Sequence, residues 1–259
     1  FVDAVPSGAL ISQYARIVKE KALLRDLGAK GTAIASRAYA DAEPAAALAE
    51  WAEQQIFAIS QVQSGNGFLQ VGRLLMPLMN QIETGSKRGS YVTGIPSGFT
   101  RLDRMTAGLQ PGELTVVGGR PSMGKSSMAL NIAEHLALEQ SVPVAIFSLE
   151  MSKEQVAQRL LCSVGRVDSS RVRTGMLADS DWPKLTAAAG KLSEAPVFID
   201  DASTLTILSM RARARRLMAE RKIGLIVVDY LQLMEGGQRS DSRQEEIAQI
   251  SRGLKAMAR

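Results

Sequence analysis

The chain has 259 residues, of which 46% are hydrophobic, 22% charged and only 5% aromatic, with a net charge of +5 and a pI near 9.5. This composition supports a folded core and permits a nucleic-acid partner without requiring one, while the few aromatic residues argue against a single-strand platform built by base stacking. Cys162 and His135 are each alone in the sequence, which excludes a disulfide framework and a thiolate metal site and favours a reducing compartment.

Residues 10–60 predict an antiparallel helical hairpin. In the first helix, apolar residues keep a helical period, which Gly28 and Gly31 are expected to break. Pro44 is suited to the first position of the second helix. The expected apolar faces are Leu10, Tyr14, Ile17, Leu24 and Leu27 in one helix, and Leu48, Trp51, Ala52, Ile56 and Ile59 in the other.

A single amphipathic helix is predicted at 71–84, after the flexible segment Ser64-Gly65-Asn66-Gly67 and before a helix-ending Gly85. Its apolar stripe is uninterrupted: Val71, Leu74, Leu75, Leu78, Met79 and Ile82. A lone helix of this length is marginal in water, so it should dock on its own chain or, as a helix in a groove, on a neighbouring subunit.

From about residue 93 the pattern becomes α/β. Strand-like runs at 114–118, 144–149, 197–200 and 225–228 alternate with helical segments at 126–138, 153–163, 182–193, 205–221 and 245–258. Such alternation predicts a mostly parallel sheet covered on both faces. Ser242 and Glu245 form a predicted capping box before the last helix. We therefore divide the chain into a helical hairpin (1–63), a linker (64–92) and an α/β domain (93–259).

A phosphate-binding P-loop lies between the first strand and its helix. Residues 119–126 fit the pattern G-x-x-x-x-G-K-[ST]: Gly119, Arg120, Pro121, Ser122, Met123, Gly124, Lys125 and Ser126, with Ser127 next to them. The glycines permit close approach to a triphosphate, Lys125 reaches the β- and γ-phosphates, and the Ser126 hydroxyl is a ligand for Mg²⁺. We expect this loop to bind ATP with Mg²⁺ at the helix N-terminus.

Two carboxylates follow strand ends and complete a candidate hydrolytic site. Asp229 directly follows the run 225–228, where it is expected to support Mg²⁺, although a turn residue would also fit there. Glu150 follows the run 144–149 and is a candidate general base for the attacking water, with a helix-capping role as the alternative.

Three further charged groups have open interpretations. Asp200 and Asp201 could bind a metal, but adjacent strand residues point in opposite directions, which favours a capping or turn role. Four arginines at 211, 213, 215 and 216 form either a solvated or intersubunit face or a DNA groove. The opposite face of the same helix is expected to be apolar, with Ile207, Met210, Ala214 and Leu217. The polar loop 236–243 is an idle surface loop or one that carries Arg239 and Arg243 to DNA phosphates.

Several segments resemble the DnaB family of replicative helicases. The segments 93–103 and 107–114 are similar to the entry of a RecA-type ATPase domain, and 14–21 to the end of that family's N-terminal hairpin. More specific matches are Arg120 to Ser126, Phe147-Ser148-Leu149-Glu150-Met151, Arg171-Val172-Arg173-Thr174-Gly175 and Asp229-Tyr230-Leu231-Gln232-Leu233-Met234.

The resemblance implies a RecA-like ATPase in a homohexameric ring that threads single-stranded DNA and unwinds the duplex at the cytoplasmic replication fork. It implies ATP and Mg²⁺ as cofactors, Lys125 and Glu150 as catalytic residues, Ser126 and Asp229 at the metal, and a linker helix at 71–84 that packs on the adjacent subunit. Primase and a helicase loader are the implied partners. The family's glutamine sensor, arginine finger and main DNA-binding loop are expected beyond Arg259, so we expect a partial chain. A RecA-like recombinase and an inactive interaction fragment are the alternatives.

Overall fold

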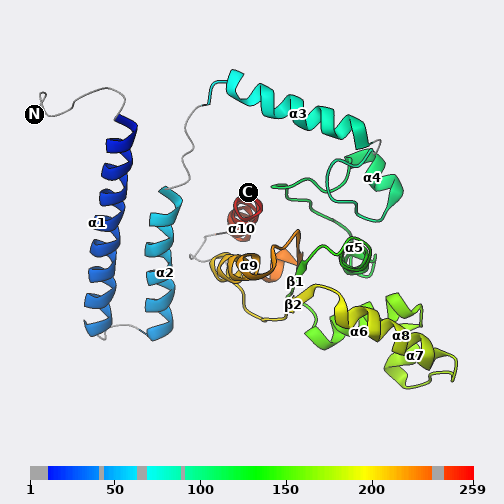
Figure 1. The fold of residues 1–259 in the computed structure, drawn as a ribbon. Helices are drawn as coiled ribbons and strands as arrows, with labels where there is room; N and C mark the ends of the chain where they lie inside the picture. The colour runs from blue at the N-terminus through cyan, green and yellow to red at the C-terminus, as the bar shows by residue number, and fades with distance from the viewer. Residues whose placement is uncertain (1–10, 41–43, 63–68, 89–90, 235–241) are drawn as a thin grey trace, which may run out of the picture. The chain divides into compact units, whose positions relative to one another are not determined.

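The computed structural model describes residues 11–40, 44–62, 69–88, 91–234 and 242–259 (Figure 1). The chain divides into two compact units, Phe1–Leu78 and Met79–Arg259, which are described separately. Within the described residues, no helix combines the length and the apolar character needed to cross a membrane.

The first unit contains an antiparallel hairpin of α1 (Ile11–Ala40) and α2 (Ala45–Val62), as predicted (Figure 1). Two cross-helix contacts fix its register. The Lys30 ammonium donates to Gln55 Oε1 at 2.6 Å, and the Arg37 guanidinium lies 4.1 Å from the centre of the Trp51 ring. Because the later residue of α1 meets the earlier residue of α2, the two helices run in opposite directions.

The prediction that Gly28 and Gly31 break the first helix is wrong, since α1 continues through both for 30 residues. A glycine in a helix interior costs only about 1 kcal/mol relative to alanine. The good helix formers around both glycines and the packing of α2 along α1 outweigh that penalty. Pro44 lies just before the first residue of α2 rather than at its first position.

The predicted linker helix is α3 (Gly72–Arg88), which extends past Gly85 to Arg88 and includes Pro77. Gly85 therefore does not end the helix, for the same reason that Gly28 does not end α1. All six residues of the apolar stripe are exposed, with exposed fractions from 47% to 67%.

The second unit contains a three-stranded parallel sheet in the order β2-β1-β3, formed by β1 (Val144–Ser148), β2 (Val197–Asp200) and β3 (Leu225–Asp229). Val144 is in register with both Val197 and Leu225. The helices are α4 (Thr100–Thr106), α5 (Lys125–Glu139), α6 (Lys153–Gly165), α7 (Ser169–Thr174), α8 (Asp181–Glu194), α9 (Ile207–Arg221) and α10 (Arg243–Ala258), with a short 3₁₀ turn, η3 (Leu231–Leu233). The predicted α/β class is confirmed.

Alternate residues of β1 enter two separate cores, because successive strand side chains point to opposite faces. Val144 and Ile146 pack with buried residues of α5 and α6, whereas Ala145 and Phe147 pack with those of α9 and α10. Helices consequently cover both faces of the sheet, which explains the nearly continuous apolar sequence of its strands.

The predicted strand at 114–118 is absent: these residues are described but form neither a strand nor a ladder with β3. Val116 and Val117 are 65% and 42% exposed. An apolar run becomes a strand only where a neighbour pairs with its N–H and C=O groups. This run lacks such a neighbour among the described residues, so its composition alone misled the prediction.

The segment before the P-loop is fixed by close backbone contacts. Ile95 and Leu109 form an antiparallel bridge, and the buried Asp103 accepts a hydrogen bond from the Ser97 N–H at 2.8 Å. Gly98 has a φ of +83°, and a Cβ there would lie 2.7 Å from His135 Cγ. His135 is therefore a packed residue.

Candidate nucleotide-binding site

The P-loop forms a tight turn at the N-terminus of α5. The Met123 N–H donates to the Arg120 carbonyl at 3.3 Å, while Ser122 and Gly124 adopt left-handed φ values of 64° and 87°. Gly124 is the cap residue of α5, and no side chain caps that end of the helix. Turns of this kind orient backbone N–H groups toward an anion, and the helix dipole adds to the attraction.

Gly119 lies against the stem of Lys125, because a Cβ at Gly119 would lie 3.2 Å from Lys125 Cγ. A Cβ at position 119 would therefore require the stem of Lys125 to shift by a few tenths of an ångström. Lys125 and Ser126 are half-buried, whereas residues 119–124 are exposed to an incoming ligand.

The P-loop lysine and the two acidic strand ends lie at one edge of the sheet. The Lys125 ammonium lies 5.5 Å from the centre of the Tyr230 ring, and Tyr230 directly follows Asp229. Ser148 is in register with Asp229, and the Leu149 N–H donates to the Asp229 carbonyl at 2.8 Å. The structure thus brings Lys125, Asp229 and the turn that carries Glu150 together, as parallel strand ends should.

Glu150 is exposed in the turn between β1 and α6. The alternative that it caps α6 is not supported, because Ser152 is the cap residue and forms a complete capping box with Gln155. The carboxylate of Asp201 accepts from the Lys153 N–H at the same helix end. Glu150 is therefore left without a capping role in this helix.

The capping or turn role expected for Asp200 and Asp201 is confirmed. Asp200 accepts from the Ala202 N–H at 3.1 Å and forms an ion pair with Arg213 at 2.7 Å. The described residues contain no group of three or more His, Cys, Asp or Glu side chains able to hold a metal by themselves.

The arginines of α9 are partly engaged with the protein. Besides the Arg213–Asp200 pair, Arg216 lies 3.4 Å from Glu220. Burial, followed by the charge of Arg215, lowers the pKa of Arg211 from its ordinary value. The opposite face of α9 is buried, as predicted, through Met210 and Ala214.

Of the two candidate DNA contacts, Arg239 lies outside the described residues. Arg243 is the first residue of α10, and its guanidinium donates hydrogen bonds to the Gln232 carbonyl and to the Glu246 carboxylate. Ser242 caps α10 by accepting from the Glu245 N–H at 3.2 Å, as the predicted capping box requires. Arg243 thus joins α10 to the segment after β3.

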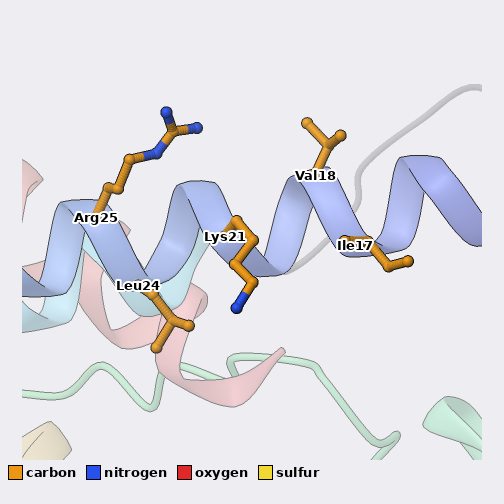
Figure 2. Close-up of a pocket in the computed structure, with 5 residues that line it drawn as sticks. All are labelled: Ile17, Val18, Lys21, Leu24 and Arg25. Carbon is orange, nitrogen blue, oxygen red and sulfur yellow. The ribbon is translucent and has the colours of Figure 1, made fainter.

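The first unit contains a shallow hollow. It lies on α1 and is lined by Ile17, Val18, Lys21, Leu24 and Arg25 (Figure 2). Ile17, Lys21 and Leu24 point to one side of the helix in this view, and Val18 and Arg25 to the other. Ile17 and Leu24, predicted to face α2, are 43% and 53% exposed.

Comparison with known proteins identifies the family. Residues 94–259 match the family described as "DnaB-like helicase C terminal domain". The chain belongs to this family. Over 258 residues, or 99% of its length, it is 45% identical to the replicative DNA helicase DnaB of Geobacillus stearothermophilus and 43% identical to the replicative DNA helicase DnaC of Bacillus subtilis (strain 168). It spans 57% of the length of each of these two relatives.

Solved structures of similar proteins share the fold. A solved ATPase domain matches with a TM-score of 0.69 and 32% identity, over 74% of this chain and 68% of that one. A DnaB-like replicative helicase, described together with its interactions with primase, matches with a TM-score of 0.67 and 28% identity, over 98% of this chain and 59% of that one. The α/β unit therefore has a RecA-like ATPase fold.

Sequence analysis missed two contacts of this site. Tyr230 was noted only as part of a motif, yet its ring faces the Lys125 ammonium. Asp201 was expected to cap a helix or form a turn, but the hydrogen bond that it accepts from the Lys153 N–H, three residues after Glu150, was not predicted. The partner residues lie far apart in the chain, so no local spacing connects them.

Proposed function

We propose that this chain is the ATP-hydrolysing part of a replicative DNA helicase, which couples hydrolysis to movement along single-stranded DNA and to duplex unwinding. The observation that carries the proposal is the convergence of Lys125, the Asp229 strand end and the Glu150 turn at one edge of the sheet. The similarity to replicative helicases over nearly the whole chain supports the same function.

The P-loop segment 119–127 binds the triphosphate through backbone N–H groups, and Lys125 offsets the charge of the β- and γ-phosphates. Glu150 orients the attacking water and accepts its proton. The hydroxyl of Ser126 and the carboxylate of Asp229 are hard oxygen ligands of the kind that Mg²⁺ prefers. When bound there, Mg²⁺ neutralises charge on the phosphates.

We propose further that the protein acts as a homohexamer joined through α3 and works on forked DNA in the cytoplasm. The six exposed apolar residues of the stripe, Val71 just before α3 and five on α3, support the assembly, since a stripe of this size is typical of a contact surface. The primase interactions described for the similar DnaB-like helicase support a primase partner, and a helicase loader is proposed on the family resemblance. Arg239 and Arg243 remain candidates for DNA contacts.

Two variants of the full-length protein test the nucleotide site. Lys125→Ala should abolish hydrolysis and weaken nucleotide binding, because it removes the charge that faces the phosphates. Glu150→Gln should keep ATP bound and lower turnover to a slow residual rate that single-turnover experiments can follow. Glu139→Gln, at the opposite end of α5, is the matched control and should retain wild-type hydrolysis. An equal loss of nucleotide binding in the Lys125 and Glu150 variants would contradict the role of Glu150.

Unwinding of a forked duplex separates the proposed function from its alternatives. A helicase should unwind the fork with hydrolysis that single-stranded DNA stimulates. Strand exchange without unwinding would instead identify a recombinase, and absence of hydrolysis in the full-length protein would identify an interaction protein.

A further inference from the structure

The turn that carries Glu150 is anchored to the sheet by two hydrogen bonds. The Ser148 hydroxyl donates to the Met151 carbonyl at 2.7 Å, and the Leu149 N–H donates to the Asp229 carbonyl at 2.8 Å. Ser148 is buried, so its hydroxyl is shielded from competing water. These bonds tie the turn to β3 and close it across Glu150 as far as Met151. Its far end, where α6 begins at Lys153, depends on other contacts.

Asp201 holds that far end. Its Oδ2 accepts from the Lys153 N–H at 3.0 Å, and its Oδ1 lies 3.7 Å from the Lys153 ammonium. Lys153 is the first residue of α6 and comes three residues after Glu150. The hydrogen bond from the Lys153 backbone is the main cause that lowers the pKa of Asp201. A carboxylate at this place satisfies an orphan N–H and complements the helix dipole.

We propose that Asp201 is a positioning residue for ATP hydrolysis, which fixes α6 and thereby the place of the Glu150 carboxylate. The inference rests on the proposed function, in which Glu150 is the general base. A base acts only within hydrogen-bond reach of its proton, and a displacement of about 1 Å can lower a rate about a hundredfold. Asp201 has no contact with the nucleotide in this proposal.

The neighbouring Asp200 provides a matched control. It is the last residue of β2, directly before Asp201, and its carboxylate is hydrogen-bonded to the Ala202 N–H and to Arg213 of α9. Replacing Asp200 therefore removes a carboxylate of similar exposure without touching α6.

The first measurement compares Asp201→Ala with Asp200→Ala in the full-length protein. Asp201→Ala should lower kcat for ATP hydrolysis by about tenfold to a hundredfold and leave KM within about twofold, because the P-loop is intact. Asp200→Ala should leave kcat within about twofold of the wild type. Titration with a fluorescent ATP analogue, which counts folded binding sites, corrects both rates for unfolded protein.

Two conservative variants separate the backbone hydrogen bond from the ion pair. Asp201→Asn retains an oxygen that accepts from the Lys153 N–H, and Lys153→Ala removes only the ammonium. Both should keep kcat within about threefold of the wild type, because an exposed ion pair contributes little. A large loss in Lys153→Ala with none in Asp201→Ala would overturn the proposed contact.

A double-mutant cycle tests whether Asp201 acts through Glu150. In the Glu150→Gln background, Asp201→Ala should cause no further loss in the single-turnover rate, because the positioned group is already absent. An additive loss, an unchanged kcat in Asp201→Ala alone, or an equal loss in Asp200→Ala would overturn the inference. If the wild-type protein fails to hydrolyse ATP, the proposed function itself fails, and the two failures are thus distinguished.

Discussion

The Lys125 ammonium lies 5.5 Å from the centre of the Tyr230 ring, within the range of a cation–π contact. This contact connects the P-loop to the residue that follows Asp229. The Tyr230 ring and a bound triphosphate would compete for the Lys125 ammonium, because the same ammonium is proposed to reach the phosphates.

Tyr230→Leu should therefore tighten binding of Mg-ATP about twofold to fivefold, which corresponds to the 0.5–1 kcal/mol of an exposed cation–π pair. Tyr230→Phe keeps the ring face and should bind as the wild type does. Equilibrium titration with a fluorescent nucleotide gives the comparison. Weaker binding in the leucine variant would mean that the ring places the lysine for the nucleotide rather than competing with it.

Two glycines should respond in opposite ways to alanine. At Gly98 the positive φ and the 2.7 Å approach to His135 Cγ oppose any Cβ, so Gly98→Ala should lower the free energy of unfolding by about 1–3 kcal/mol. Gly190 lies inside α8 with open space around it, so Gly190→Ala should raise the same free energy by about 0.5–1 kcal/mol. Denaturant unfolding measures both, and a loss in Gly190→Ala would contradict the second expectation.

Sequence patterns predicted the elements whose signals are local. The P-loop depends on fixed spacing, and the α9 face through Met210 and Ala214 depends on helical period. The incorrect predictions concern elements whose structure depends on contacts with residues far away in the chain as well as on local propensity. Gly28 and Gly85 weaken a helix only slightly, and the run at 114–118 would have needed a pairing partner. Propensity alone does not contain that information.

The candidate site was predicted residue by residue, but not its connections. Lys125, Glu150 and Asp229 carry motif signals, and the shared edge of a parallel sheet accounts for their proximity. The bond from Lys153 to Asp201 joins residues 48 positions apart, so helical or strand period cannot indicate it. Only the packing of α6 against the sheet places these two groups together.

The buried Asp181 predicts an acid-sensitive contact around α8. It accepts from the Ala178 N–H at 3.2 Å, and this bond is the main cause that lowers its pKa; Lys184 and Arg171 add to the effect. A carboxyl with a lowered pKa stabilises the fold above its unfolded pKa of about 3.9, and the contribution is lost as the pH falls through the folded value. Stability should therefore fall below about pH 4.

Asp181→Asn should lower stability at pH 7 and reduce this acid dependence, because the amide does not titrate. Asp179→Asn is the control, since Asp179 is exposed and lies only two residues away. The midpoints of urea unfolding at pH 7 and pH 3 measure the acid dependence of each variant and of the wild type. Equal acid dependence in the Asp181 variant and the wild type would contradict the assignment.

The apolar stripe of α3 gives the last prediction, which concerns assembly. Leu75 and Leu78 are 49% and 47% exposed, in the middle of a stripe of six exposed apolar residues. Burying a leucine contributes about 1.5–3 kcal/mol, so replacing both with Asp should weaken assembly about a hundredfold or more. Met76→Asp is the matched control: Met76 is apolar and 70% exposed on the same helix, but it lies off the stripe.

Light scattering measures the mass of the assembly, and circular dichroism measures the helix content. The double variant should dissociate while the ATPase unit stays folded, and the Met76 variant should keep the wild-type mass. An unchanged mass in the double variant would mean that the stripe packs on its own chain rather than on a neighbour.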